Sequence, residues 1–287
     1  MSHISCMSFN ILACDTHDSG YELPANRLSY VLETIKQNNA DLVGLQEVCD
    51  QACAPSEKRD ARCGDFNWCE AMLSAASSMG YTAVAIRDQQ GFLREKQNIG
   101  CGLMIYYKTD RFEMLENGCE VFPHNDVRYF QWVKLHDKQY DRTLLFTNTH
   151  FSINPKIGDT KSQMAGDAYR TTQSTLLMKF WYKQGAENLA LFATGDYNSA
   201  PESNAQTLLR SHKFKPSYLI AEISDERGTM NFRKTAHTID FCYVNPTAQA
   251  VKQYKVITTH FYSERSRYAL AGYPSDHRAI MTYCNYL

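Results

Sequence analysis

Apolar and polar residues follow two different periods along the chain, and each period predicts a class of element. Short apolar runs bounded by turn-forming residues are typical of buried strands. Apolar positions that recur three and four residues apart are typical of one face of an amphipathic helix. The runs predict strands at 4–9, 41–48, 81–86, 98–107, 128–135, 143–150, 189–196, 238–244, 251–259 and 277–286. The helical pattern occurs at 23–37, 65–79, 161–184 and 201–211.

The mixture of strands and helices predicts an α/β protein. The segment between 98–107 and 128–135 is rich in charge, so we expect a connection there. No repeat with a period of about 20 to 50 residues, no low-complexity tract and no linker is visible. We therefore expect residues 1–287 to form a single catalytic domain.

One apolar run, 189–194, ends abruptly in Gly195-Asp196-Tyr197-Asn198. Ligands of open α/β sheets bind beyond the carboxyl ends of the strands. Asp196 and Asn198 are two residues apart, so an extended backbone would point both side chains to one face. Asp and Asn after a strand are also ordinary turn formers, and for this stretch alone a turn is the simpler interpretation.

Polar residues flank other expected strands in the same way. Asn10, Glu47 and His150 each end an apolar run. Asp276 and His277 lead into the last one, and Asp240 lies near the start of another. A carboxylate at the end of a buried strand is costly unless it is paired, hydrogen-bonded or bound to a cation. Chance explains one or two such placements but not all of them.

This set of side chains indicates a particular chemistry. Hard oxygen ligands without a cysteine or a clustered histidine pair suit Mg²⁺ or Mn²⁺ rather than zinc. Histidines near carboxylates supply an acid, a base or phosphate contacts. The combination fits metal-assisted attack of water on a phosphoester, in which charge builds on the phosphoryl oxygens.

Composition and charge narrow the partners. The chain has 287 residues, a formal net charge of −1 and a pI near 6.7, which gives no global argument for binding long duplexes. No apolar run approaches the roughly 18 residues that cross a bilayer. The N-terminus lacks a basic region followed by an apolar one, so we expect a cytoplasmic protein. We also expect a monomer.

Ten cysteines are more than a cytosolic protein of this size needs. Three lie in apolar runs and are expected to be buried small hydrophobes: Cys6, Cys242 and Cys284. Four crowd a polar insertion at about 49–69 without a zinc-like spacing: Cys49, Cys53, Cys63 and Cys69. Disulfides, free thiols and a metal clip all stay open for this insertion. Disulfides would indicate an oxidising compartment and a secreted protein.

Six short motifs, in order along nearly the whole chain, resemble the endonuclease/exonuclease/phosphatase superfamily. They are Ser8-Phe9-Asn10-Ile11, Leu45-Gln46-Glu47-Val48, Thr147-Asn148-Thr149-His150-Phe151, Gly195-Asp196-Tyr197-Asn198-Ser199, Thr238-Ile239-Asp240 and Ser275-Asp276-His277. The resemblance implies a four-layer α/β sandwich, with two mostly antiparallel sheets packed face to face and helices outside.

The resemblance also implies roles for these residues. Glu47 would be the principal Mg²⁺ ligand, helped by Asn10 and Asp276. Asp196 would orient or deprotonate the attacking water, and Asn198 would hold the water or a phosphate oxygen. His277, oriented by Asp240, would contact the scissile phosphate or act as the base. His150 would contact phosphate or protonate the leaving oxygen.

One departure from the family concerns the strand at 98–107. Many members open this strand with a Glu or Asp, and here only Asn98 or Cys101 stands at that place. If the acid of the family partners the position of His150, leaving-group protonation would be weaker, or Glu95 would reach in.

The substrate class is less well defined by the sequence. The position of Arg170 after His150 resembles the pattern of the deadenylase-type and small-substrate phosphodiesterase branches of the family. A loop that contains Tyr262, Arg265 and Arg267 has three interpretations. Its aromatic and basic side chains would stack on a base and bind a phosphate, or they would contact a membrane surface. In the third interpretation the loop is solvated and has no ligand. Together with Arg128, these four residues are the candidate substrate contacts.

The sequence therefore predicts a Mg²⁺-dependent phosphodiesterase that acts as a nuclease on DNA or RNA. A phosphatase or phosphodiesterase of a small metabolite or lipid headgroup is the alternative within the same chemistry. An inactive binding module that retains the fold is the alternative from another class. The near-neutral charge favours short or single-stranded substrates over long duplex.

Overall fold

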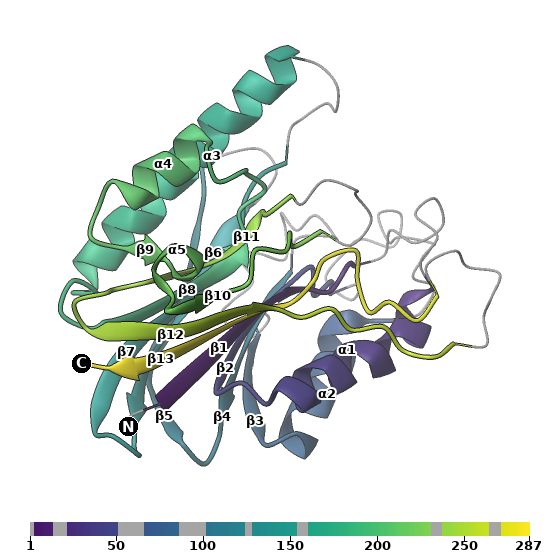
Figure 1. The fold of residues 1–287 in the computed structure, drawn as a ribbon. Coiled ribbons are helices and arrows are strands. Elements are labelled where there is room, and N and C mark those ends of the chain that lie inside the picture. Colours follow the sequence, from purple (N-terminus) through teal and green to yellow (C-terminus); the bar gives the residue numbers. More distant parts are fainter. Residues whose placement is uncertain are drawn as a thin grey trace.

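A computed structural model describes residues 3–13, 22–50, 66–85, 102–123, 128–153, 160–230, 237–263 and 271–287. Two β-sheets lie face to face, and helices cover their outer faces (Figure 1). The two sheets are mixed, with seven and six strands. The four-layer α/β sandwich expected from the motifs is confirmed.

The seven-stranded sheet has the order β10-β12-β13-β1-β2-β4-β3. Its strands are β1 (His3–Asn10), β2 (Leu42–Gln46), β3 (Tyr81–Ala85), β4 (Leu103–Lys108), β10 (Ile223–Ser224), β12 (Gln249–Val256) and β13 (Ile280–Tyr286). In its centre β1 runs parallel to β2 and antiparallel to β13. The ends of β1 and β2 and the start of β13 therefore lie at one edge of the sheet.

The six-stranded sheet has the order β5-β6-β7-β8-β11-β9. Its strands are β5 (Phe112–Val121), β6 (Tyr129–Asp137), β7 (Arg142–His150), β8 (Ala190–Asp196), β9 (Lys215–Pro216) and β11 (Asp240–Val244). β7 runs parallel to β8, and β11 runs antiparallel to β8. The ends of β7 and β8 and the start of β11 share one edge.

Three apolar clusters hold the layers together. One packs α1 (Pro24–Asn38) and α2 (Trp68–Ser78) against the seven-stranded sheet. A second fills the space between the sheets. A third packs α3 (Thr160–Lys183) and α4 (Asn204–Arg210) against the six-stranded sheet. A further short helix, α5, spans Ser217–Ile220.

The expectation of a connection between 98–107 and 128–135 is wrong in part, because β5 lies there. β5 is the edge strand of its sheet, and most of its side chains are exposed or half-buried. Its charged residues face solvent, so the segment lacks the apolar run of a core strand. The short elements β9, α5 and β10 were also not expected from the pattern.

Candidate active site

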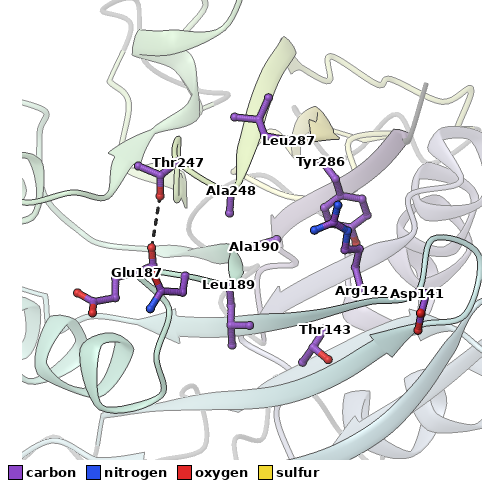
Figure 2. A pocket seen from close by; sticks show the side chains of 11 residues that line it. Asp141, Arg142, Thr143, Glu187, Leu189, Ala190, Thr247, Ala248, Tyr286 and Leu287 are labelled. Atoms are coloured by element: carbon purple, nitrogen blue, oxygen red, sulfur yellow. Dashed lines mark hydrogen bonds between the residues drawn. The ribbon is translucent and has the colours of Figure 1, made fainter.

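Two places on the sandwich are candidates for a site. A cavity of about 500 Å³ lies where β7 and β8 begin and β13 ends (Figure 2). Its rim carries Arg142, Glu187 and Thr247, and the Thr247 hydroxyl donates to the Glu187 carbonyl at 3.3 Å. None of its lining residues, all within the described ranges, has a buried side-chain polar atom that lacks a hydrogen-bond partner. Nothing in this lining points to a specific ligand.

The opposite edge of the sandwich holds the polar residues singled out from the sequence. Strand register explains how they meet. His150 ends β7 directly beside Asp196 at the end of β8, and Asp196 is in turn paired with Asp240 at the start of β11. On the facing sheet, Asn10 ends β1 beside the end of β2. The site is therefore built from groups on both sheets.

Glu47 follows the last residue of β2 with a positive φ of 62°. A non-glycine residue rarely adopts this backbone, and such residues cluster at functional sites. Its carboxylate accepts a hydrogen bond from Asn10 Nδ2 at 2.9 Å and from the Ala13 amide at 2.9 Å. Asn10 Nδ2 also donates to Asp196 Oδ2 at 3.0 Å, so one amide links the carboxylates of the two sheets.

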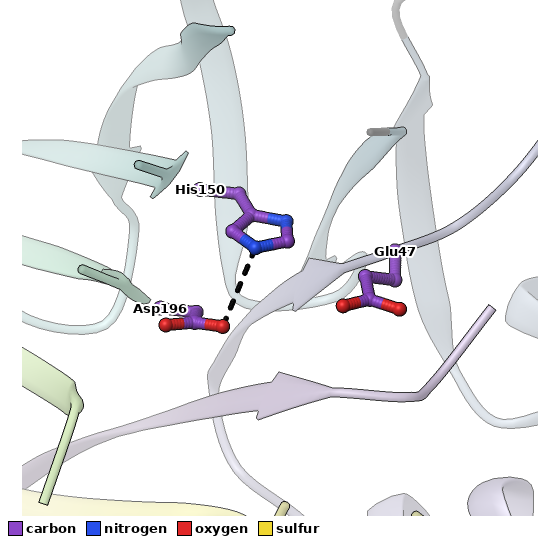
Figure 3. A group of neighbouring side chains, drawn as sticks. All are labelled: Glu47, His150 and Asp196. Atoms are coloured by element: carbon purple, nitrogen blue, oxygen red, sulfur yellow. Dashed lines mark ion pairs between the residues drawn. The ribbon is translucent and has the colours of Figure 1, made fainter. Parts of the chain in front are cut away.

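Asp196 lies buried between two imidazoles. His150 Nε2 is 3.3 Å from its Oδ2 (Figure 3). His277 Nε2 is 3.7 Å from the same atom. The Asn198 amide donates to the other carboxylate oxygen at 2.8 Å. Burial alone would raise the pKa of Asp196, but the charges of the two histidines outweigh it and hold the pKa well below its usual range. Asp196 is therefore a carboxylate at neutral pH.

His150 Nδ1 is buried and has no hydrogen-bond partner among the residues that the structure describes. The positions considered for a partnering acid, Asn98, Cys101 and Glu95, lie outside the described residues. The consequence of the family departure for leaving-group protonation stays a prediction.

His277 is held by Asp240. Its Nδ1 lies 2.9 Å from Asp240 Oδ2, and both side chains are buried. Burial lowers the pKa of His277, but Asp240, Asp276 and Asp196 together raise it well above its usual value. Burial raises the pKa of Asp240, and the charge of His277 opposes that rise. The pair is best described as an imidazolium against a carboxylate.

The donor set fits a hard divalent cation. Glu47, His150 and Asp196 each present one ligand atom, and these atoms lie within 4.8 Å of one another (Figure 3). Asp276 Oδ1 lies 4.0 Å from His277 Nε2. Burial raises the pKa of Asp276, His277 opposes that rise, and the charge of Glu47 adds to it. A bound cation would relieve this repulsion between carboxylates, and oxygen ligands of this kind suit Mg²⁺ or Mn²⁺.

The structure thus brings together seven of the eight residues assigned to catalysis or metal binding: Asn10, Glu47, His150, Asp196, Asp240, Asp276 and His277. Asn198 adjoins them through its backbone, but its side-chain amide donates to the Phe151 carbonyl at 2.9 Å. The individual roles of these eight residues stay predictions.

The candidate substrate contacts are less uniform. Arg170 is buried on α3 and donates to the Ser152 carbonyl at 3.1 Å. Burial lowers its pKa, and the charges of Asp167 and Asp196 oppose that shift without cancelling it. Arg128 is also buried, whereas Tyr262 is 86% exposed. Arg265 and Arg267 lie outside the described residues.

Three cysteines are buried as the sequence predicts. Cys6, Cys242 and Cys284 are buried between or within the sheets. Cys49, which follows β2, and Cys69, on α2, are also buried in an apolar cluster, so the polar insertion has core positions at both ends that the sequence did not indicate. Cys53 and Cys63 lie outside the described residues, so the redox state of the insertion stays a prediction.

Sequence reasoning missed a buried arginine behind the site. Arg27 of α1 is completely buried and donates to the carbonyls of five residues: Ile11, Leu12, Ala13, Glu22 and Pro274. It ties the segment after β1 to the segment before β13. Nothing in the sequence signalled this role, because a basic residue beside the apolar face of an amphipathic helix is expected to point into solvent.

It also missed four buried polar residues beneath the site: Ser8, Gln46, Asn148 and Thr194. Three of them precede a site residue by two positions on the same strand. Because alternate residues of a strand share a face, that spacing was a usable signal.

The profile described as the Endonuclease/Exonuclease/phosphatase family matches residues 7–277. A curated relative, the CCR4-Not complex 3'-5'-exoribonuclease subunit Ccr4 of Debaryomyces hansenii, is 23% identical in an alignment 229 residues long, which covers 63% of this chain. The chain spans only 27% of the length of that relative.

Two solved structures share the fold. The mannosyl-6-phosphatase Bt3783 of Bacteroides thetaiotaomicron has a TM-score of 0.71 at 21% identity, covering 98% of this chain and 99% of that one. D. rerio TDP2 complexed with a single-strand DNA product has a TM-score of 0.68 at 16% identity, covering 99% of this chain and 100% of that one. No helix in the described part of the chain combines the length and apolar character needed to span a membrane.

Proposed function

Because the chain belongs to the endonuclease/exonuclease/phosphatase family of phosphoester hydrolases, we propose that it is a Mg²⁺-dependent phosphodiesterase that cleaves short or single-stranded nucleic acid. The observation that carries this proposal is the buried Asp196 carboxylate, placed between His150 and His277 and within reach of Glu47. Such a group has the charge and the neighbours that a base or water-orienting residue requires.

Glu47 and Asp276 would hold the cation, with Asn10 holding Glu47 in place or serving as a further ligand. The cation, when bound, supplies Lewis-acid stabilisation of charge on the phosphoryl oxygens. Ala13 keeps the Glu47 carboxylate fixed through its amide, so the ligand is preorganised on the backbone turn that follows β2.

Asp196 orients or deprotonates the attacking water, since it is ionised at neutral pH and fixed by the Asn198 backbone amide. Its lowered pKa favours the orienting role. His277, charged and held by Asp240, directs its Nε2 to the phosphate and stabilises the charge that develops there. His150 lies on the other side of Asp196 and supplies a phosphate contact or a proton for the leaving oxygen.

Two similarities support nucleic acid as the substrate class. The Debaryomyces hansenii relative is an exoribonuclease subunit, and the TDP2 structure holds a single-strand DNA product. The net charge of −1 disfavours long duplexes, whose binding rests on many phosphate contacts. A strand with few contacted phosphates fits this charge better.

A phosphatase is the second candidate, because the similar Bacteroides thetaiotaomicron structure is a mannosyl-6-phosphatase. The two functions differ in the bond that is cleaved. A phosphatase takes a terminal phosphomonoester, whereas a nuclease takes a diester with a second substituent on phosphorus.

The decisive experiment compares a diester with a monoester under one metal condition. We expect Mg²⁺-dependent hydrolysis of bis-p-nitrophenyl phosphate to exceed that of p-nitrophenyl phosphate. Glu47→Ala and His277→Ala should abolish hydrolysis while remaining folded. Full activity in these folded variants would show that the site is misassigned, and activity on the monoester alone would favour the phosphatase.

A substrate panel then identifies the class. We would compare plasmid, single-stranded DNA, poly(A) RNA, sphingomyelin and inositol phosphates at equal Mg²⁺. Cleavage of the single strands in preference to the plasmid is expected, and rapid plasmid nicking at physiological salt would contradict it. Binding of single strands without hydrolysis of any substrate would support the inactive binding module.

A further inference from the structure

A layer of polar side chains connects the two sheets directly beneath the site. This inter-sheet polar layer consists of Ser8 on β1, Gln46 on β2, Asn148 on β7 and Thr194 on β8, each at most 1% exposed. Below it, the space between the sheets is filled with apolar side chains, among them Leu42, Phe146 and Phe192. The layer therefore separates the apolar core from the site.

Asn148 makes the central connection. Its Nδ2 crosses from β7 to the seven-stranded sheet and donates to the carbonyls of Leu45 at 2.8 Å and Met104 at 3.2 Å. Its Oδ1 accepts from Gln46 Nε2 at 2.6 Å. One side chain thus makes three hydrogen bonds to the opposite sheet, and one of them is to the residue that precedes Glu47.

The other two members extend the layer to the remaining strands. Gln46 Nε2 lies 3.2 Å from the Ser8 hydroxyl on β1. The Thr194 hydroxyl lies between two acceptors on β7, the Thr147 carbonyl at 3.2 Å and Asn148 Oδ1 at 3.4 Å. Each strand that ends at Asn10, Glu47, His150 or Asp196 is therefore joined to the same small network.

The sheets approach each other closely at this level. A Cβ added to Gly44 would lie 2.1 Å from the Thr194 hydroxyl and 2.7 Å from Asn148 Oδ1. Only a glycine fits there, as is common where another backbone or side chain approaches a strand. The spacing of the sheets at this level is thus set by hydrogen bonds, whose lengths vary little. Apolar packing, in contrast, tolerates the replacement of one hydrophobic side chain by another of similar volume.

We propose that Asn148 and Gln46 are positioning residues that set the distance between Glu47 on one sheet and the His150–Asp196 pair on the other. The inference rests on the proposed function, because that chemistry needs the cation ligand and the water-orienting carboxylate at a fixed separation. A misplacement of about 1 Å in a catalytic group costs on the order of a hundredfold in rate. Asn10 links the same carboxylates within the site, and the layer supports that link from below.

The test compares two buried positions on the same face of β7. Asn148→Ser removes the three hydrogen bonds to the facing sheet. Leu144→Ala, in the apolar part of the inter-sheet core, opens a cavity and lowers stability without touching the layer. For each folded variant we would measure the Mn²⁺ dissociation constant by electron paramagnetic resonance, and kcat and KM for bis-p-nitrophenyl phosphate with Mg²⁺.

We expect Asn148→Ser to weaken Mn²⁺ binding severalfold and to lower kcat by about tenfold or more, with KM nearly unchanged. Leu144→Ala should leave all three quantities within about twofold of the wild type at a temperature where it is folded, since its loss is one of packing. Gln46→Met, which keeps the length of the side chain and removes its donor, should reproduce the effect of Asn148→Ser.

The proposal is overturned if the folded Asn148→Ser and Gln46→Met variants bind Mn²⁺ and turn over substrate as the wild type does. Unfolding of both variants under conditions where Leu144→Ala stays folded would also overturn it, because the layer would then be structural only. Failure of the proposed function is distinguishable: wild-type protein would lack Mg²⁺-dependent hydrolysis, or Glu47→Gln would retain it.

Discussion

Nε2 of His150 lies 3.3 Å from Oδ2 of Asp196, and the two residues end neighbouring parallel strands in direct register. The same oxygen faces His277 Nε2 at 3.7 Å. One buried carboxylate oxygen is therefore the meeting point of both imidazoles, and its negative charge orients them. Removing that charge should affect the whole constellation rather than one contact.

We expect Asp196→Asn to lower kcat by about 10²–10⁴-fold, because the amide keeps the shape but neither accepts a proton nor attracts the histidines. The KM for bis-p-nitrophenyl phosphate should change much less. Steady-state kinetics with saturating Mg²⁺ measure both. Asp225→Asn is the matched control, since Asp225 pairs with Arg227 outside the site, and its kcat should stay near that of the wild type. A kcat for Asp196→Asn within threefold of the wild type would exclude a direct role.

The cation should stabilise the fold as well as support the reaction. A ligand that binds only the folded chain raises the free energy of unfolding by about 2.7 kcal/mol at 100 times its dissociation constant. We expect Mg²⁺ or Mn²⁺ to raise the melting temperature of the wild type and EDTA to reverse the rise. Glu47→Gln should show little response, whereas Glu116→Gln, at the exposed ion pair with Lys134, should respond as the wild type does. An equal rise in Glu47→Gln would place the cation elsewhere.

The sequence pattern predicted which residues lie at the ends of the core strands better than it predicted how the strands are divided between the two sheets. Each central strand is an apolar run that stops at a polar residue, so the pattern correctly placed Asn10, His150 and Asp196 at strand ends. The pairing of β1 with β2 in one sheet and of β7 with β8 in another depends on contacts between distant segments, and the family resemblance implied two packed sheets without assigning strands to them. Local patterns do not carry that information.

Two misses have a physical cause in common. β5 is an edge strand whose charged side chains face solvent, and Arg27 is a charged residue that turns inward. Neither shows the regular alternation of buried apolar and exposed polar positions from which elements are predicted. The first lacks a buried face, and the second replaces water with five carbonyl groups that lie far apart in the sequence.

Arg27→Met should destabilise the protein strongly. Leaving a buried acceptor without its donor costs about 1–3 kcal/mol, and several carbonyls lose their donor here, so we expect a loss of at least about 3 kcal/mol in the free energy of unfolding. Urea denaturation measures it. Lys36→Met, at an exposed position of the same helix, should change the free energy by less than about 0.5 kcal/mol. Equal effects of the two substitutions would show that the buried guanidinium contributes nothing specific.

The stability of the cation-free protein should depend on pH through His277. Its folded-state pKa is raised well above the usual value by Asp240, Asp276 and Asp196 in spite of burial. In the unfolded chain the imidazole titrates near about pH 6.5. The stabilisation from the imidazolium is therefore fully present below about pH 6.5 and is lost as the pH rises through the folded-state pKa.

Comparison with His277→Gln in EDTA isolates this contribution. The difference in free energy of unfolding between wild type and variant should be constant below about pH 6.5 and should shrink above it, by up to about 1.4 kcal/mol per pH unit. Urea denaturation between pH 6 and 9, as an approximate working range, would measure it. Asp240→Asn removes the partner of Nδ1 and lowers the folded-state pKa of His277, so in that background the decline should still begin at about pH 6.5 but should end at a lower pH. A difference that stays constant over the whole range would mean that His277 is neutral in the folded protein, and its role would then be that of a hydrogen-bond donor without charge.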